Sequence, residues 1–311
     1  MGLAVGRQLA EKGANVVIVA RNKQKLIEGL EHIRSGALHP TSQRFLQISA
    51  NLTSPAEASR VIEEVVAWNS GPPDIVWCCA GTARPSLFID TPASELDKQM
   101  QSNYFTSAYM AHAAMKSWLR KSSQSDAGRP IQPVPRHLIF TSSLCAFYSF
   151  TGYTPYTPAK AALRALSDTL SQEVNLYMGA NPNEPPIRLH TIFPGTILSE
   201  GYELENTIKT DVTKMLEEGD PGQTPEVIAR KSIKALEGGE ELITTDFNTG
   251  LLRRTMIGGN KRGFARVIGD WFLASLLTIV IVFVRGDMDR KVRNWGRAFG
   301  ASGMKTEREL K

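Results

Sequence analysis

Cysteine is scarce in this sequence, and its few histidines are scattered. Among 311 residues there are five histidines and three cysteines, of which Cys78 and Cys79 are adjacent and Cys145 stands apart. This number and spacing exclude a disulfide framework and offer no Cys/His pattern suited to a metal ion. The cysteines are therefore expected to be small buried hydrophobic residues in a protein of a reducing compartment.

Long apolar runs are also lacking. The longest uncharged apolar stretch, residues 271–284, would be about 21 Å long as a helix, short against a hydrocarbon core of about 30 Å. No signal peptide is visible, although little follows from this because the sequence opens on a predicted helix. There is no internal repeat, and a composition of 42% hydrophobic and 22% charged residues is that of a folded protein.

Excess positive charge is missing from most of the chain and concentrated at its end. Residues 250–311 hold 13 Lys and Arg against 5 Asp and Glu, a net +8, which leaves −3 for residues 1–249. This balance argues against a nucleic-acid-binding body. It predicts a tail that meets an anionic membrane surface, with Trp271 and Trp295 at headgroup depth. The alternative is that the apolar stretch is buried in a subunit interface.

Apolar strands and helices alternate along residues 1–249. The predicted strands are 15–20, 45–49, 74–79, 136–142, 187–193 and 241–245. The predicted helices are 1–13, 22–34, 55–69, 94–121, 155–177 and 224–237. Continuous apolar strands separated by helices specify an α/β fold with a doubly wound parallel sheet. Surface loops are expected at 122–135 and 179–186, and residues 196–222, without strong periodicity, are expected to form a lid-like loop.

A tyrosine and a lysine lie four residues apart at the start of the predicted helix 155–177. Tyr156 and Lys160 would share one helix face, and the ammonium would lower the pKa of the phenol from about 10 toward neutrality. The phenol could then exchange a proton at physiological pH. Ser143 adds a hydroxyl at a strand end, where an α/β sheet forms its ligand crevice. By itself Tyr-x-x-x-Lys is a weak signal, and an incidental surface pair is the alternative.

With the motifs around it, this arrangement resembles the short-chain dehydrogenase/reductase family over roughly residues 2–245. The family's catalytic residues correspond here to Asn103, Ser143, Tyr156 and Lys160. Cys78-Cys79-Ala80-Gly81 is similar to the family's Asn-Asn-Ala-Gly turn, and Pro194-Gly195 to its turn beside the nicotinamide. The resemblance implies a Rossmann-type sheet in a nucleotide-binding domain at 1–249, followed by a hydrophobic, basic extension at 250–311.

The resemblance also implies a nicotinamide cofactor, and the residue after strand 15–20 would meet its adenine ribose. An acidic residue there binds the 2′-hydroxyl, whereas an arginine accommodates a 2′-phosphate. Arg21 occupies this place, with Lys23 and Lys25 nearby, so NADPH is favoured over NADH; Arg21 as an ordinary solvated residue is the alternative. The expected cofactor-binding residues are Gly2, Arg21, Asn22, Lys25, Asn51, Leu52, Ala80, Gly81, Tyr156, Lys160, Pro194 and Gly195.

Three departures from the family pattern stand out. Only Gly2 remains of the glycine-rich phosphate turn, and the strand before it is not in the sequence, so we expect a gap in the sheet and a weaker catalyst than a chain with that strand. Asn51 stands where the family usually has an aspartate that contacts adenine. Cys78 replaces the first asparagine of its turn.

Within the family, this chain is similar to the reductases of sphingoid-base synthesis, because a basic, apolar extension follows its reductase body. This similarity implies NADPH-dependent reduction of a long-chain keto-lipid at the endoplasmic reticulum membrane, with the body facing the cytoplasm and residues 264–297 on the membrane. No nucleic acid or metal partner is expected, and homodimerisation stays open. The alternatives are reduction of a steroid, retinoid or 3-ketoacyl group, and an inactive membrane-associated scaffold.

Overall fold

A computed structural model describes residues 1–119, 134–254 and 264–300. The predicted loop at 122–135 lies almost wholly outside the described residues, as do two parts of the C-terminal extension. The predicted strands are confirmed to within a residue or two. They are β1 (Val16–Ala20), β2 (Phe45–Ser49), β3 (Ile75–Cys78), β4 (Arg136–Thr141), β5 (Ile187–Phe193) and β6 (Leu242–Thr244).

Every strand pair is parallel, but the strands form two sheets. β1 pairs only with β2, and the second sheet has the order β3-β4-β5-β6. Between the facing edges of β1 and β3 lies a cavity of about 960 Å³, lined by residues of both strands and by the first turn of the N-terminal helix. The gap that the sequence predicted in the sheet is therefore present.

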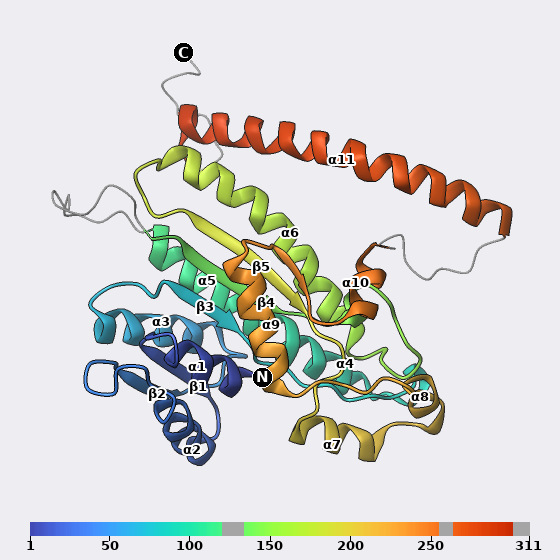
Figure 1. Cartoon of the computed structure of the whole chain (residues 1–311), viewed down its shortest axis with the longest axis horizontal. Helices are drawn as coiled ribbons and strands as arrows, with labels where there is room; N and C mark the ends of the chain where they lie inside the picture. Colours follow the sequence, from blue (N-terminus) through green and yellow to red (C-terminus); the bar gives the residue numbers. More distant parts are fainter. Residues whose placement is uncertain (120–133, 255–263, 301–311) are drawn as a thin grey trace.

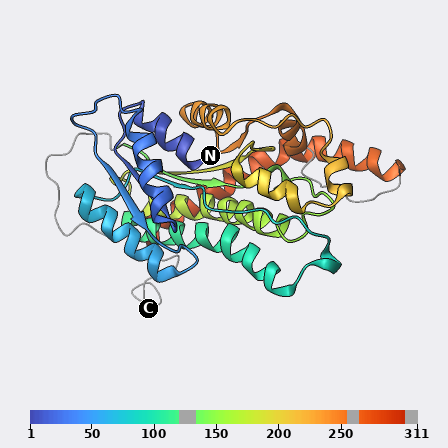
Figure 2. The same cartoon turned by 90° about the horizontal axis from the view of Figure 1, so that it is seen from below.

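Helices cover both faces of the sheets. They are α1 (Gly2–Ala10), α2 (Lys23–Arg34), α3 (Pro55–Asn69), α4 (Ala93–Met100), α5 (Thr106–Leu119), α6 (Thr157–Ala180), α7 (Glu200–Ile208), α8 (Asp211–Leu216), α9 (Pro225–Glu237), α10 (Phe247–Arg254) and α11 (Phe264–Phe299). Figures 1 and 2 show α1 and α9 on one side and α3 and α5 on the other. This is the doubly wound arrangement that the sequence predicted.

The largest core cluster lies between the strands and helices α3, α5 and α6. Small residues let the helices approach closely: Ala58 of α3 and Ala114 of α5 are fully buried beside Leu138 and Phe140 of β4. Two local signals start helix α3. The Ser54 side chain accepts a hydrogen bond from the Glu57 amide, and a proline occupies the first turn. The core therefore fixes β4, whose carboxyl end forms part of the site described below.

Two sequence predictions about helices were wrong in part. The helix predicted at 94–121 is interrupted by a π-helical turn at Gln101–Phe105, labelled η2. Residues 196–222 contain helices α7 and α8 rather than an irregular loop. The Ser199 side chain caps α7 by accepting from the Tyr202 amide, and Glu205 and Lys209 form an ion pair one turn apart. The helix cap and the ion pair are local signals for a helix, and helices form here although the apolar residues show only weak helical periodicity.

Helix α11 is much longer than the apolar run at 271–284 suggested. Its 36 residues make it about 54 Å long, and its C-terminal part packs against α6 (Figure 1). A Cβ at Gly296 would lie 2.0 Å from the Leu176 carbonyl oxygen, and one at Gly179 would lie 2.2 Å from the Arg293 carbonyl oxygen. Glycine in both helices thus permits this close crossing.

The expected domain boundary at 249/250 falls inside α10. Within residues 1–119, 134–254 and 264–300, every helix falls short of the combination of length and apolar character that a bilayer crossing requires.

Candidate active site

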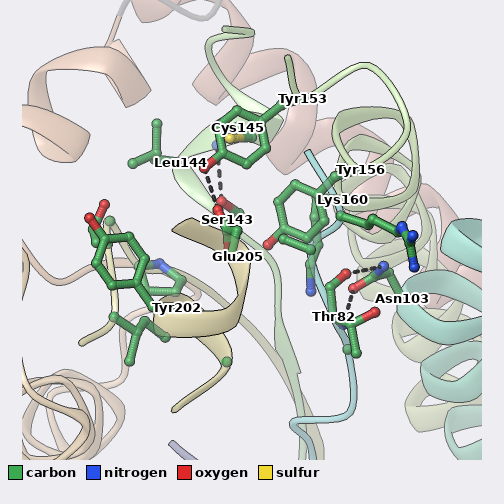
Figure 3. A pocket seen from close by; sticks show the side chains of 18 of the residues that line it. Thr82, Asn103, Ser143, Leu144, Cys145, Tyr153, Tyr156, Lys160, Tyr202 and Glu205 are labelled. Atoms are coloured by element: carbon green, nitrogen blue, oxygen red, sulfur yellow. Dashed lines mark hydrogen bonds between the residues drawn. The ribbon is translucent and has the colours of Figure 1, made fainter. Parts of the chain in front are cut away.

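A cavity of about 1280 Å³ opens at the carboxyl ends of β3, β4 and β5, the edge at which doubly wound sheets bind ligands. All four predicted catalytic residues line it (Figure 3). Of the predicted site residues, the cavity wall contains Arg21, Gly81, Asn103, Ser143, Tyr156, Lys160, Pro194 and Gly195. Segments far apart in the sequence therefore meet here.

All but one of the other predicted cofactor residues lie along the second cavity, between the two sheets. Gly2, Lys25, Asn51, Leu52 and Ala80 line it. The two cavities share wall residues, among them Arg21 and Gly81, and so are neighbours. Asn22 lines neither cavity. Its side chain instead caps α2 by accepting a hydrogen bond from the Lys25 amide at 3.0 Å.

Ser143 and Tyr156 present hydroxyl groups to the first cavity. Ser143 follows β4, and its Oγ accepts a hydrogen bond from the Cys145 amide at 3.2 Å. Since this contact uses the oxygen as acceptor, the hydroxyl can still donate, to the neighbouring Tyr156 phenol or to a ligand. Tyr156 occupies the N-cap position of α6 without a capping hydrogen bond from its side chain, and its phenol points toward Ser143 in Figure 3. A carbonyl oxygen in this cavity could thus meet two donors.

Lys160 is buried one turn into α6 and joins that helix to the end of β4. Its Nζ donates to the Thr141 carbonyl at 2.9 Å, and its own carbonyl accepts from Ser142 Oγ at 2.9 Å. The Nζ lies 5.5 Å from the centroid of the Tyr156 ring. These contacts hold the tyrosine and lysine on one face, as the spacing predicted.

The prediction for the pKa of Tyr156 was wrong for this structure. Burial is the dominant effect and raises the pKa of the phenol well above its usual value; the Ser143 hydroxyl opposes this rise and the charge of Glu205 adds to it. Burial also lowers the pKa of Lys160 to about 8. The lysine does not reverse the phenol's shift: because its own pKa lies below that of the phenol, it has already lost its charge where the phenol would ionise.

Asn103 is fully buried in the π-helical turn η2, a kind of irregularity common at functional sites. Its amide exchanges two hydrogen bonds with the Thr82 backbone: Thr82 N–H donates to Oδ1 at 3.0 Å, and Nδ2 donates to the Thr82 carbonyl at 2.8 Å. A Cβ on Gly81 would lie 2.6 Å from Asn103 Oδ1 and 3.3 Å from Lys160 Nζ. Glycine at this position therefore lets the loop after β3 approach both Asn103 of η2 and Lys160 of α6.

The shared walls of the two cavities fit a dinucleotide. The first turn of α1 has no side-chain cap, so its amide groups are available to an anion. The Arg21 side chain is exposed at the border and, within the described chain, forms no ion pair. Lys25 is instead paired with Glu200 at 2.7 Å, and Asn51 Oδ1 accepts from Thr53 Oγ1 at 3.0 Å. Arg21 is thus the cation best placed for a phosphate.

The three cysteines are free. Burial raises the pKa of Cys78 to about 12 and that of Cys145 to about 11, and it also raises the pKa of Cys79. The thiols therefore stay protonated and unreactive. Cys78 and Cys145 are buried, as the sequence predicted, whereas Cys79 is partly exposed.

Sequence reasoning missed an ionic cluster in the same cavity. The Tyr153 hydroxyl shares its one proton between Glu205 and Glu217, and Lys209 pairs with Glu205 at 3.1 Å and with Glu217 at 2.6 Å. The spacing of Glu205 and Lys209 was a usable signal for a helix. Nothing in the sequence connected them with Tyr153, which lies some fifty residues earlier.

The cluster joins α7 and α8 to the loop before Tyr156. A Cβ on Gly152, which has a φ of +93°, would lie 2.1 Å from Thr213 Oγ1, and that hydroxyl donates to the Thr151 carbonyl at 3.1 Å. Helices α7 and α8 thus line the cavity where the sequence predicted a lid-like loop.

The chain is similar to known proteins over most of its length. Residues 1–207 match the family model for short chain dehydrogenase. The 3-ketodihydrosphingosine reductase ksrA of Aspergillus fumigatus is 46% identical over 307 residues, covering 95% of this chain and 82% of that protein. The 3-ketodihydrosphingosine reductase gsl-3 of Neurospora crassa is 38% identical, covering 96% of this chain and 80% of that protein.

Solved structures show the same fold at lower identity. A short-chain type dehydrogenase/reductase from Mycobacterium ulcerans has a TM-score of 0.63 and 20% identity, covering 80% of this chain and 86% of its own. A putative short-chain dehydrogenase/reductase from Burkholderia xenovorans has a TM-score of 0.63 and 15% identity, covering 80% of this chain and 90% of its own. At these identities the likeness concerns the fold alone.

Proposed function

The chain belongs to the short-chain dehydrogenase family, and from that membership we propose that it reduces 3-ketodihydrosphingosine to dihydrosphingosine with NADPH. Its class is that of a nicotinamide-dependent oxidoreductase of sphingolipid biosynthesis. The observation that carries the proposal is 46% identity, over 95% of the chain, to a curated reductase of that name. The cavity in which Ser143, Tyr156 and Lys160 meet supplies groups for the chemistry.

In this proposal Tyr156 donates the proton that the ketone oxygen gains, and Ser143 orients that oxygen. The Ser143 Oγ accepts a hydrogen bond from the Cys145 amide, so the hydroxyl can still donate its proton to a ketone oxygen. Two donors at one carbonyl oxygen stabilise negative charge as it develops. A bound nicotinamide cofactor supplies the hydride.

Lys160 restores the proton that Tyr156 gives away. With its pKa lowered to about 8, the lysine is mainly protonated at pH 7 yet can release a proton. Asn103 is a positioning residue: its bonds to Thr82 hold the β3 loop against Lys160. In the relay implied by the family, Asn103 also holds a water that connects Lys160 with solvent.

We assign the preference for NADPH to Arg21. An arginine after this strand accommodates a 2′-phosphate, and the Arg21 side chain lines both neighbouring cavities. The first turn of α1 and Gly81 would hold the pyrophosphate and nicotinamide parts, respectively. Pro194 and Gly195 would close the nicotinamide end.

The proposed enzyme acts at the endoplasmic reticulum membrane with its catalytic body in the cytoplasm. Support comes from α11, which exposes an apolar stripe with helical spacing. The stripe consists of Ile268, Trp271, Phe272, Leu276, Ile279 and Phe283. Exposed cations follow it, including Arg290 and Arg297, and would suit an anionic leaflet. Homodimerisation through the same stripe is the alternative.

The proposed reaction is tested by incubating the purified protein with NADPH and 3-ketodihydrosphingosine. Mass spectrometry should detect dihydrosphingosine with the wild-type protein and none above background with a Tyr156→Phe control. Turnover of steroid, retinoid or 3-ketoacyl ketones without turnover of the sphingoid ketone would overturn the substrate assignment. Cofactor binding without turnover of any of these ketones would favour an inactive scaffold.

A further inference from the structure

The catalytic cavity has an acidic wall on the side of α7 and α8. Glu205 of α7 and Glu217 after α8 both line the cavity, and their side chains keep 13% and 20% of their accessible surface. Lys209, the cation between them, has a side chain that is 0% exposed. The carboxylates therefore face the cavity, whereas their cation lies behind them.

This wall carries one negative charge in excess. Two carboxylates share one ammonium, and the third member, Tyr153, stays neutral because burial and the charge of Glu205 raise its pKa far above the usual range. Burial works against the Lys209 ammonium, but the two carboxylates outweigh it and raise the pKa of that lysine. Lys209 thus remains charged and still leaves one carboxylate charge without a counter-charge. A partly buried unbalanced charge favours the entry of a cation.

One oxygen of the wall is open to a ligand. Both oxygens of Glu217 are engaged, Oε1 by Tyr153 and Oε2 by Lys209. Glu205 receives the Tyr153 hydroxyl and the Lys209 ammonium on Oε1 alone. Its Oε2 accepts no hydrogen bond from any residue in the described part of the chain. Glu205 lines the same cavity as Ser143 and Tyr156, and all three are labelled in Figure 3.

We propose that Glu205 binds the amino group of the substrate and thereby selects 2-amino-3-ketones over ketones that lack the amine. This inference rests on the proposed function, since dihydrosphingosine carries its amine on the carbon next to the one that bears the reacting oxygen. An ammonium there lies beside the carbonyl that Ser143 and Tyr156 bind. The free Oε2 of Glu205 offers a charge-assisted hydrogen bond, and Glu217, Lys209 and Tyr153 hold the carboxylate in place.

Neutralising this wall would also assist proton donation. The negative charge of Glu205 raises the pKa of Tyr156, which disfavours the phenolate left after the proton transfer. A substrate ammonium beside Glu205 cancels that effect at the moment of reaction. A ketone without the amine leaves the charge uncompensated, so the discrimination acts on the transition state as well as on binding.

A purely structural role for the cluster, fastening α7 and α8 over the cavity, makes a different prediction. It requires the same loss for every substrate, because the position of the helices does not depend on the substrate's amine. The test therefore compares two ketones that differ only in this group. They are 3-ketodihydrosphingosine and its analogue with hydrogen in place of the amine.

The experiment measures kcat/KM for both ketones with the wild-type protein and with Glu205→Gln. The glutamine keeps the size of the side chain and an oxygen for Tyr153 while removing the charge. We expect the preference for the amino ketone to fall about 10- to 100-fold, the scale of a hydrogen bond to a charged group. The matched control is Glu203→Gln, an exposed carboxylate on the same helix, which should keep the wild-type ratio.

Equal losses for the two ketones, or an unchanged ratio, would overturn the role of Glu205 and leave the proposed reaction standing. A wild-type protein that reduces only the ketone without the amine would overturn the proposed function and this inference together. If Glu205→Gln fails to fold, as judged by circular dichroism, Glu205→Asp replaces it. Aspartate keeps the charge on a shorter side chain, so the amino ketone should lose kcat/KM more than the analogue does; a uniform loss would refute the proposal.

Discussion

Two hydrogen bonds fasten the start of α6, which carries Tyr156 and Lys160, to the end of β4, which Ser143 follows. Lys160 Nζ bonds to the Thr141 carbonyl, and Ser142 Oγ bonds to the Lys160 carbonyl. At this scale burial sets the protonation states, because it raises the pKa of Tyr156 and lowers that of Lys160. A phenol that keeps its proton until a ketone oxygen arrives suits a proton donor.

Replacing Tyr156 by Phe should remove the proton donor and little else. We expect kcat to fall about 10²- to 10⁴-fold, the usual contribution of a general acid, while the Kd for NADPH stays within a few-fold. Single-turnover hydride transfer and a fluorescence titration with NADPH measure the two quantities. Hydride transfer at the wild-type rate in the variant would refute the assignment.

Arg21 should determine the choice of cofactor. In Arg21→Asp, the ratio of kcat/KM for NADPH to that for NADH is expected to shift toward NADH by about 1–3 kcal/mol, the scale of a hydrogen bond to a charged group. Lys23→Asp, an exposed substitution of equal charge two residues later, serves as the control and should shift the ratio less. An unaltered ratio in Arg21→Asp would make Arg21 an ordinary solvated residue.

The His137–His190 pair should make the fold sensitive to mild acid. The two rings share a 2.9 Å contact; burial lowers the pKa of His137 to about 4 and also lowers that of His190. The unfolded chain, with histidine pKa values near 6.5, binds more protons than the folded one between about pH 6.5 and 4. Stability should therefore fall as pH drops through this window.

Melting curves between pH 7 and 4.5 test this, since His137→Gln should show a smaller loss of Tm on acidification than the wild type. His32→Gln, an exposed histidine, is the control and should behave like the wild type. A variant with the full wild-type pH dependence would count against the pair as its source.

At the scale of elements, short-range packing determines how the helices that cover the site are held. Gly152 is close enough to Thr213 that no side chain fits between the loop and α8. The ionic cluster around Lys209 fastens α7 to the same loop. A change in this contact should therefore reach the site through the position of the covering helices.

Gly152→Ala should displace α8 and impair substrate binding. Its Cβ would lie 2.1 Å from Thr213 Oγ1 at a φ of +93°, so we expect a loss of about 1–3 kcal/mol in stability and a raised KM for the ketone. Gly219→Ala is a matched control, because Gly219 has a φ of +88° with no atom within 4 Å. If both variants show the same KM, strain rather than the contact is responsible.

At the scale of the whole molecule, the apolar stripe of α11 lies outside the core clusters of the body. The C-terminal part of α11 packs on α6, where Arg293 donates to Asn175 at 2.9 Å. Large side chains nearer its N-terminus are exposed, including Trp271 at 69% and Phe283 at 74%. Exposed aromatic residues on one helix face are typical of an interaction surface.

A triple substitution of Trp271, Phe272 and Phe283 by serine should abolish flotation of the protein with anionic lipid vesicles. Phe88→Ser/Ile89→Ser, which removes exposed apolar residues elsewhere, is the control and should float as the wild type does. The subunit-interface alternative predicts instead that the triple variant changes elution in size-exclusion chromatography. A wild-type protein that does not float would rule out the membrane proposal.

The sequence by itself determined the alternation of strands and helices, because continuous apolar runs and helix caps are local signals. It also located Tyr156 and Lys160 on one helix face, since four residues complete about one turn. Spacing could not give the pKa of Tyr156, which depends on how deeply the fold buries the phenol. Nor could it connect Glu205 and Glu217 with Tyr153, or Gly296 with Leu176, since each pair is joined only when distant segments pack. The length of α11 likewise depended on charged residues beyond the apolar run, which continue a helix that packing on α6 supports. Local order thus followed from the sequence, whereas the charge and shape of the catalytic cavity were decided by tertiary contacts.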